Sequence, residues 1–366
     1  MWCELEASLT RRAVCAEMSS NNFGKGKPED YDPMFDAIID SANMLEAYHY
    51  TQLGKPRLKP SAMLFKEDYV ANLKVLAEEI KNGEYKHQGY HKFRVYEPKV
   101  RVIFAPTYRD KVVQHMVNNM LRDFYEPKFI YDSYSCIRGK GNQAAVKRIQ
   151  MFQNSAYDVY DDPYHLKLDI SKFFYTIDRA ILKKILRKKI KGPYTLALLD
   201  QIIDSFHEPL GLPLGNLTSQ LFANIYLNEI DQLIKRKYKV RYYVRYADDM
   251  FLIVENKEKA IELKNMLIKD ITDILALTIN PKKVNVVPAK KISGLGFNMR
   301  PGYLTLLSRN KRSMKKMIKK NEVTSLNSWY GYAHIAQTHT TIKNAINNTD
   351  ILFIDNKFVA SELKAS

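Results

Sequence analysis

Polar and apolar residues alternate in a few short stretches of this chain, which is the pattern of β-strands. In residues 166–170 (LKLDI), leucine and isoleucine alternate with a lysine and with Asp169. Two apolar runs, residues 241–246 (RYYVRY) and 250–254 (MFLIV), flank a short break at residues 247–249 (ADD). β-Branched and aromatic residues on both sides of such a break predict a β-hairpin with the three residues at its turn.

Helical spacing of apolar residues accounts for much of the remaining chain. It predicts helices at residues 34–50, 69–80, 143–150, 179–190, 219–233, 257–275 and 311–320. Thr218 or Ser219 is the expected N-cap of the helix at 219–233. Residues 93–104 alternate well enough for a second hairpin, and residues 351–358 suit a short strand or a docking segment. Residues 1–33 end in a stretch rich in Gly, Lys, Asp and Pro, and are expected to form a flexible segment.

Asp248 and Asp249 are candidate metal ligands. Adjacent carboxylates repel each other and are costly to desolvate unless a cation neutralises them. Asp169, among the apolar residues of its predicted strand, would supply a third carboxylate. Such an oxygen-rich site suits Mg²⁺, which prefers a few carboxylates together with substrate phosphates. The alternatives are a solvated acidic turn for the pair and a helix cap for Asp169.

The order of these and other motifs resembles that of reverse transcriptases over roughly residues 90–300. The first fingers motif corresponds to residues 99–106 with 109–114, and the second to residues 134–145. Palm motifs A, B, C and D correspond, in that order, to the Asp169 segment and to residues 211–224, 246–249 and 280–283. The primer-grip motif E corresponds to residues 294–297. The resemblance implies an α+β right-hand polymerase, with fingers, a palm bearing an antiparallel sheet, and a helical thumb. Its parts would be a flexible segment (1–33), an N-terminal extension with the fingers (34–160), the palm with residual fingers elements (161–300) and the thumb (301–366).

The resemblance also implies roles for individual residues. Asp169, Asp248 and Asp249, joined by the main-chain carbonyl of Ile170, would hold two Mg²⁺ ions, with Mn²⁺ as a substitute. Lys283 would serve as general acid or charge stabiliser beside the leaving pyrophosphate, and Lys282 is the alternative. Binding of the incoming dNTP is assigned to Lys99, Arg101, Phe174, Leu214 and Gly215. Binding of template and primer is assigned to Arg138, Gly139, Gln220, Gly294 and Gly296.

Several of these roles have a plainer alternative. Lys99 and Arg101 could be exposed strand charges, although a guanidinium fork suits a triphosphate. The glycine-rich turn that contains Arg138 and Gly139 could be an ordinary helix entry. Residues 280–283 could be only a basic turn, and Leu214 could simply pack against its neighbours.

The B motif narrows the resemblance to one group. Most reverse transcriptases carry Gln-Gly before this loop and Ser-Pro at its end, whereas this chain has Leu214-Gly215 and Ser219-Gln220. That pattern is similar to the enzymes of diversity-generating retroelements, which copy a template-repeat RNA and err at its adenines. The resemblance implies a structured template-repeat RNA, an RNA/cDNA duplex and a small basic, oligomeric accessory protein as partners. Other prokaryotic reverse transcriptases (retron, phage-defence or intron type) and a non-catalytic RNA-binding protein remain alternatives.

Composition agrees with a nucleic-acid partner. The 366 residues carry 57 Lys+Arg against 40 Asp+Glu, a formal net charge of +17 that suits a polyanion. Cys3, Cys15 and Cys136 show no CxxC spacing, which favours a reducing compartment without a zinc site. Apolar runs are too short to span a bilayer, so no membrane association and a cytoplasmic location, in a bacterium or phage-infected cell, are expected.

Overall fold

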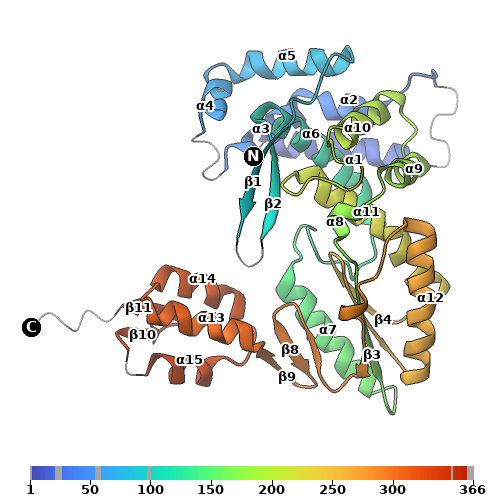
Figure 1. Ribbon diagram of the computed structural model, residues 1–366. Helices are drawn as coiled ribbons and strands as arrows, with labels where there is room; N and C mark the ends of the chain where they lie inside the picture. Colours follow the sequence, from blue (N-terminus) through green and yellow to red (C-terminus); the bar gives the residue numbers. More distant parts are fainter. Residues whose placement is uncertain (1, 21–26, 54–58, 97–99, 348, 361–366) are drawn as a thin grey trace, which may run out of the picture. The chain divides into compact units, whose positions relative to one another are not determined.

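The computed structural model describes residues 2–20, 27–53, 59–96, 100–347 and 349–360. The chain divides into two compact units. Unit 1 comprises residues 1–130, 170–233 and 269–278, and unit 2 comprises residues 131–169, 234–268 and 279–366. Both units combine helices with antiparallel strands (Figure 1). The predicted α+β class with antiparallel sheets is therefore confirmed.

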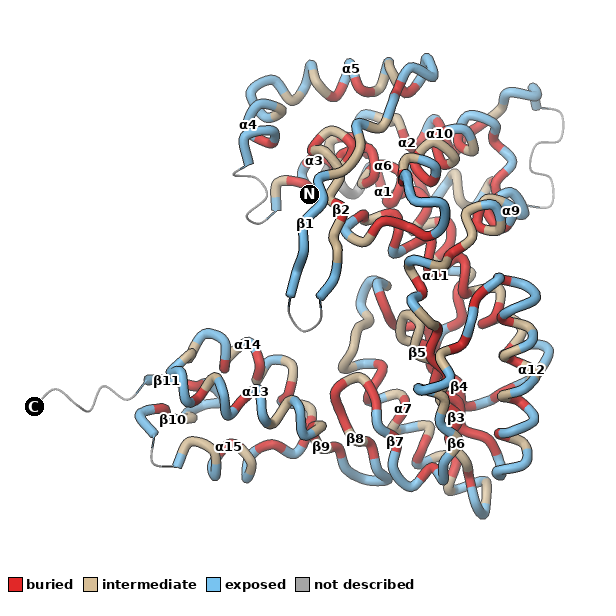
Figure 2. The backbone as a smooth tube through the Cα atoms, viewed as in Figure 1, coloured by how far each residue is buried: buried red, intermediate tan, exposed pale blue. Residues whose placement is uncertain are grey.

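Unit 1 is organised around helix α6 (Tyr108–Tyr125), which is buried along most of its length (Figure 2). Helices α1, α2, α3 and α11 all pack against it. The other elements of this unit are α1 (Trp2–Met18), α2 (Pro33–Ile39), α3 (Ser41–Thr51), α4 (Pro60–Glu67), α5 (Tyr69–Lys81), the 3₁₀ turn Glu126–Lys128, α8 (Phe173–Thr176), α9 (Arg179–Lys189), α10 (Pro193–Asp204) and α11 (Leu217–Gln232). Strands β1 (Tyr90–Val95) and β2 (Arg101–Pro106) form the predicted hairpin at residues 93–104.

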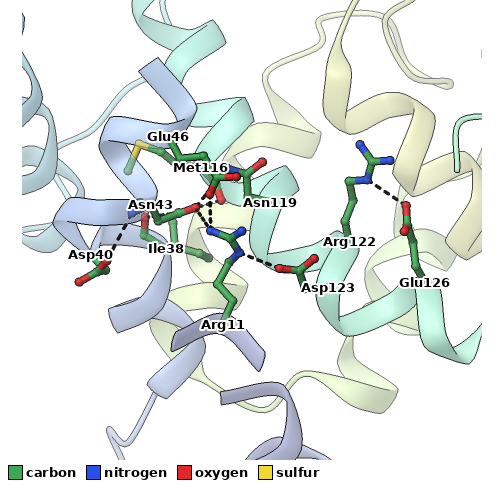
Figure 3. A network of polar contacts seen from close by, with 10 residues as sticks. All are labelled: Arg11, Ile38, Asp40, Asn43, Glu46, Met116, Asn119, Arg122, Asp123 and Glu126. Carbon is green, nitrogen blue, oxygen red and sulfur yellow. Dashed lines mark hydrogen bonds and ion pairs between the residues drawn. The ribbon is translucent and has the colours of Figure 1, made fainter. Parts of the chain in front are cut away.

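A buried ionic network attaches α1 to α3 and α6 (Figure 3). Arg11 is only 1% exposed. Its Nη1 lies 2.7 Å from Glu46 and 3.0 Å from the side-chain oxygen of Asn43, and its Nε lies 2.8 Å from Asp123. A buried guanidinium is tolerated when its donors are paired in this way. Residues 2–18 are thus a helix held to unit 1, which differs from the flexible segment expected for residues 1–33.

Unit 2 contains two antiparallel sheets, a C-terminal hairpin and the helices that cover them. Its helical elements are α7 (Asn142–Tyr157), the π-helical turn Leu233–Lys237, α12 (Lys257–Leu275, whose last turns belong to unit 1), the 3₁₀ turn Pro281–Lys283, α13 (Ser308–Lys319), α14 (Val323–Ala333) and α15 (His339–Ile346). Its strands are β3 (Tyr164–Asp169), β4 (Tyr242–Tyr246), β5 (Asp249–Val254), β6 (Asn285–Pro288), β7 (Ile292–Gly294), β8 (Phe297–Arg300), β9 (Tyr303–Leu306), β10 (Ile351–Ile354) and β11 (Lys357–Ala360).

The first sheet has the order β4-β5-β3-β6, with every neighbouring pair antiparallel. Strands β4 and β5 form the hairpin predicted around the Ala-Asp-Asp sequence, and β3 is the predicted strand that ends at Asp169. Directly opposed residues on antiparallel strands point to the same face. Val244 and Phe251, which oppose each other, therefore share a face, and both belong to the core formed with α7, β8 and β9.

Two local predictions on helix ends were wrong. Residues 34–50 form two helices, because the backbone of Asp40 is extended and its carboxylate accepts hydrogen bonds from the main-chain nitrogens of Ala42 and Asn43 at the start of α3. Helix α11 begins at Leu217 with Asn216 as its N-cap, in place of the expected Thr218 or Ser219. The segment 351–358, predicted as a strand or docking segment, lies in the hairpin β10–β11.

Candidate active site

Strand pairing gathers the three predicted catalytic carboxylates at one end of the first sheet of unit 2. Asp169, the last residue of β3, lies directly opposite Asp249, the first residue of β5. Asp248 immediately precedes Asp249 in the turn of the β4–β5 hairpin. Cα atoms of opposed antiparallel residues lie about 4.5–5.5 Å apart, so the side chains of Asp169 and Asp249 start as near neighbours on one face.

The turn that carries Asp248 is tight and unusual. Tyr246 pairs with Asp249, so only Ala247 and Asp248 connect the strands. Ala247 has φ +52°, a left-handed conformation that costs a residue with a side chain more than it costs glycine. Burial is the main cause that raises the pKa of Asp248 to about 6, and the charges of Asp249 and Asp169 contribute in the same direction. The site therefore concentrates negative charge that a cation would relieve.

Lys283 supplies one such cation. Its Nζ lies 2.8 and 2.7 Å from the two carboxylate oxygens of Asp169. The hydrogen bond to Asp169 raises the pKa of Lys283, and the charges of Asp249 and Asp248 act in the same direction. The turn that presents this lysine is fixed because the main-chain nitrogen of Asn280 donates to the main-chain oxygen of Asp169 at 2.8 Å. Lys282, the alternative, is exposed and is not the residue that contacts Asp169.

Lys167, which was not among the predicted site residues, supplies a second cation. Its Nζ lies 2.9 Å from Oδ1 of Asp249 and 5.0 Å from the ring centre of Phe251. Lys167 precedes Asp169 by two residues in a strand, and such residues face the same side. The two-residue period of the strand was the signal in the sequence that places Lys167 on the face of Asp169. It was missed because a lysine in an alternating pattern is ordinarily assigned to the solvent face.

The carboxylate oxygens of this cluster are suitable ligands for a divalent metal ion, although the three carboxylates do not surround a common metal position. Among the described residues, no three His, Cys, Asp or Glu side chains converge as a ready metal site. Asp169 and Asp249 instead each contact an ammonium group, which marks the places where a cation is favourable. Mg²⁺ needs only one or two carboxylates when water and substrate phosphates complete its shell. The role of the Ile170 carbonyl stays a prediction, since Ile170 belongs to unit 1.

Three of the residues predicted to bind the dNTP are gathered in unit 1. The main-chain nitrogen of Phe104, in β2, donates to the oxygen of Leu214 at 2.7 Å, and Leu212 donates to the oxygen of Phe174 at 2.7 Å. A Cβ on Gly215, whose φ is +118°, would lie 2.9 Å from the oxygen of Phe104, so glycine is required there. The loop at residues 211–215 is thus held against β2 and α8.

The remaining dNTP predictions concern the β1–β2 hairpin. Arg101 begins β2 and is exposed. Lys99 lies outside the described residues. The contacts of both with a triphosphate stay predictions.

The residues predicted to contact template and primer have mixed environments. Arg138, Gly139 and Gln220 are exposed. Gly294 and Gly296 are buried, and their backbones lie against side chains: a Cβ on Gly294 would lie 2.5 Å from the ring of Phe251, and one on Gly296 would collide with the hydroxyl of Tyr332. Packing alone therefore requires glycine at residues 294 and 296, and their contacts with nucleic acid stay predictions.

Ion pairs account for several charges of the basic helix α9. Lys183 pairs with Asp204 at 2.5 Å, Arg187 pairs with Asp200, and Lys188 pairs with Glu229. Helix α13 is different, because Met314 and Ile318 are buried whereas Arg312, Lys315 and Lys316 are exposed. Of the two helices, α13 offers the more open positive face to a phosphate backbone.

Nowhere in the described part of the chain is a helix both long and apolar enough to cross a membrane.

One family model matches more than half of this chain. The model of the family "Reverse transcriptase (RNA-dependent DNA polymerase)" matches residues 86–299. Protein YkfC of Escherichia coli (strain K12) is 26% identical over 172 residues, which are 44% of this chain and 44% of that protein. The match therefore spans less than half of that relative's length.

Two similar solved structures are fungal telomerases, each in complex with a fragment of telomeric RNA. Telomerase from Candida albicans is 12% identical with a TM-score of 0.46, and the match covers 78% of this chain and 61% of that chain. Telomerase from Candida tropicalis is 11% identical with a TM-score of 0.49, and the match covers 72% of this chain and 53% of that chain.

Proposed function

This chain belongs to the reverse transcriptase (RNA-dependent DNA polymerase) family, and from that membership we propose that it is an RNA-directed DNA polymerase. The observation that carries the proposal is the pairing of Asp169 with Asp249, beside Asp248, at the end of an antiparallel sheet. In the proposed reaction, the 3′-hydroxyl of a primer attacks the α-phosphorus of a dNTP and pyrophosphate leaves.

Each residue of the cluster has a defined task in this proposal. Asp169, Asp248 and Asp249 would hold the Mg²⁺ ions, with Mn²⁺ as a substitute. When bound, such ions stabilise the attacking and leaving oxygens of an in-line displacement. Lys283 would neutralise or protonate the leaving pyrophosphate. The ion pair with Asp169 keeps Lys283 protonated, since it raises the pKa of the lysine.

We further propose that the enzyme serves a diversity-generating retroelement, copying a template-repeat RNA into cDNA with errors opposite adenine. Support comes from Leu214, which stands where most relatives carry glutamine. Its side chain is half-buried and aliphatic, so it offers no hydrogen bond to an incoming nucleotide. Looser base selection follows from the loss of a polar contact. A structured RNA and a small basic, oligomeric accessory protein are the partners that this proposal requires.

Two other functions compete with this one. A retron, phage-defence or intron enzyme would use the same carboxylates but copy its RNA with errors spread over all four bases. A non-catalytic RNA-binding protein would bind RNA without metal-dependent synthesis. The carboxylate cluster favours a catalyst over this second alternative, because binding RNA does not require three acidic groups at one sheet edge.

Primer extension with sequencing of the cDNA tests the proposal. The template is the RNA transcribed beside the gene, supplied with dNTPs, Mg²⁺ and any small basic protein encoded there. The control is the variant Asp248→Ala/Asp249→Ala, which should lose synthesis but retain its fold and RNA affinity. Errors concentrated opposite template adenines support the retroelement assignment, and evenly spread errors move the enzyme to the retron or defence class. Synthesis by the double variant at the wild-type rate would overturn the catalytic assignment.

A further inference from the structure

Two ammonium groups contact the carboxylate cluster, and they differ in freedom of movement. The side chain of Lys283 is 47% exposed and extends from a 3₁₀ turn, whereas that of Lys167 is 15% exposed and extends from a strand of the sheet. Lys283 can therefore leave Asp169 by rotating into solvent. The more enclosed side chain of Lys167 has less room to leave Asp249.

The surroundings of Lys167 direct its charge toward Asp249. Lys167 lies opposite Phe251 across the β3–β5 pair, and its Nζ is within cation–π distance of that ring. The missing side chain of Gly294 leaves room for this arrangement, because a Cβ there would approach both the ring of Phe251 and the Nζ of Lys167, at 2.5 and 3.8 Å. The stem of the lysine is therefore enclosed while its ammonium group reaches the carboxylate at 2.9 Å.

We propose that Lys167 is a built-in counter-cation that competes with the divalent metal ion for Asp249. This inference rests on the proposed function, since it concerns the same metal site. In the metal-free protein, Lys167 and Lys283 neutralise two of three clustered carboxylates. When metal binds, Lys283 is free to leave, whereas Lys167 remains and lowers the affinity of the metal for Asp249. Metal loading there then depends on additional negative ligands, which the triphosphate of a dNTP provides.

Binding of Mn²⁺ to the full chain, without nucleotide or nucleic acid, tests this directly. Free Mn²⁺ is measured by electron paramagnetic resonance during titration of the metal-free protein. Lys167→Met keeps the aliphatic stem and removes the charge, and Lys167→Arg keeps the charge. Lys259→Met is the matched control, because Lys259 pairs with Glu262 at 2.9 Å on the surface and its loss changes net charge equally.

The expected result is that Lys167→Met binds Mn²⁺ at least roughly tenfold more tightly than the wild-type protein, since a unit charge near the metal is removed. Lys167→Arg and Lys259→Met should bind like the wild type. Adding a non-hydrolysable dNTP analogue should tighten Mn²⁺ binding more in the wild type than in Lys167→Met.

Equal Mn²⁺ affinity for Lys167→Met and Lys259→Met overturns the inference and leaves the proposed function intact. Absence of Mn²⁺ binding in every variant, both without and with the dNTP analogue, overturns the inference and the proposed function, because no metal then binds at these carboxylates. If Lys167→Met does not fold, the more polar Lys167→Gln carries the same comparison. Circular dichroism of each variant establishes folding before titration.

Discussion

The guanidinium of Arg245 donates a hydrogen bond from Nη1 to the main-chain oxygen of Ala247 at 3.1 Å. Arg245 is fully buried in β4; its main-chain nitrogen donates to the oxygen of Asp132, and its main-chain oxygen accepts from the nitrogen of Tyr134. Ala247 is the residue with φ +52° in the turn that carries Asp248. A rigid donor therefore holds the carbonyl of the strained residue from which Asp248 and Asp249 follow.

Arg245→Met is expected to lower kcat by roughly tenfold or more while leaving the KM for primer–template nearly unchanged, because it loosens the turn that positions two carboxylates. Ala247→Gly in the same background should restore part of the activity, since glycine adopts positive φ without the cost of about 1 kcal/mol borne by alanine. Single-turnover kinetics of the single and double variants measure both effects. If the added glycine restores nothing, Arg245 supports the fold without positioning the turn.

Asp248 makes the stability of the metal-free protein depend on pH. Its pKa of about 6 lies above the ordinary value of 3.8, so between these values the folded state binds more protons than the unfolded state. The free energy of unfolding therefore falls as pH rises through this window, and the loss is complete above about pH 6. Asp248→Asn should be more stable than the wild type by roughly 2–3 kcal/mol at pH 7, and the difference should vanish near pH 4.

Denaturant unfolding in EDTA at several pH values measures this difference. Asp273→Asn, at an exposed position of α12, is the control and should show no such pH-dependent gain. A constant difference between Asp248→Asn and the wild type from pH 4 to 7 would contradict the raised pKa. Saturating Mg²⁺ should stabilise the wild type more than Asp248→Asn, because the metal replaces the proton at this carboxylate.

The strands that carry the three candidate carboxylates could be predicted from the sequence, because their patterns are local. The alternation before Asp169 and the apolar runs around Ala247 determine β3 and the β4–β5 hairpin without reference to the rest of the chain. The break within the predicted helix at 34–50 could also have been predicted, since Asp40 directly precedes Ser41 and aspartate is a favourable N-cap.

Local sequence patterns could not predict that Arg11 is buried or that Lys167 contacts Asp249. The partners of Arg11 in its buried network, Glu46 and Asp123, are 35 and 112 residues distant in the chain. No local pattern reports such pairing, and an isolated arginine is ordinarily assigned to the surface. To predict the contact of Lys167 with Asp249, one must know which face of β3 the lysine occupies and which strand pairs with β3. The pairing of strands is a tertiary property that no local pattern reports.

Leu214→Gln is expected to lower the error rate opposite template adenine. The main chain at Leu214 is held by the hydrogen bond from Phe104, so a glutamine there would present its amide from a fixed backbone. One added hydrogen bond to the correct nucleotide corresponds to a change of roughly threefold to tenfold in misincorporation. Sequencing of cDNA measures it, with Leu210→Gln, at an exposed position of the same segment, as control. An error spectrum identical to that of the control would count against Leu214 as a determinant of fidelity.

The turn between β7 and β8 is held by side chains from three helices. Leu295 and Gly296 both have positive φ, of +53° and +91°. The Tyr332 hydroxyl donates to the oxygen of Leu295 at 2.8 Å, Asn142 donates to the same oxygen at 3.2 Å, and Asn310 donates to the oxygen of Gly296 at 3.0 Å. Because the resemblance assigns this turn to the primer, its position should determine how the primer end is held.

Tyr332→Phe and Asn310→Ala are each expected to raise the KM for primer–template by roughly threefold to tenfold, with kcat and Mn²⁺ binding nearly unchanged, because each removes one hydrogen bond to the turn. Tyr330→Phe is the matched control: it lies on the same helix, but its hydroxyl donates to Asn356 in the C-terminal hairpin at 2.8 Å. Steady-state extension at varied primer–template concentration separates KM from kcat. The same KM for Tyr332→Phe and Tyr330→Phe would show that these contacts support packing of the C-terminal helices and leave primer binding to other residues.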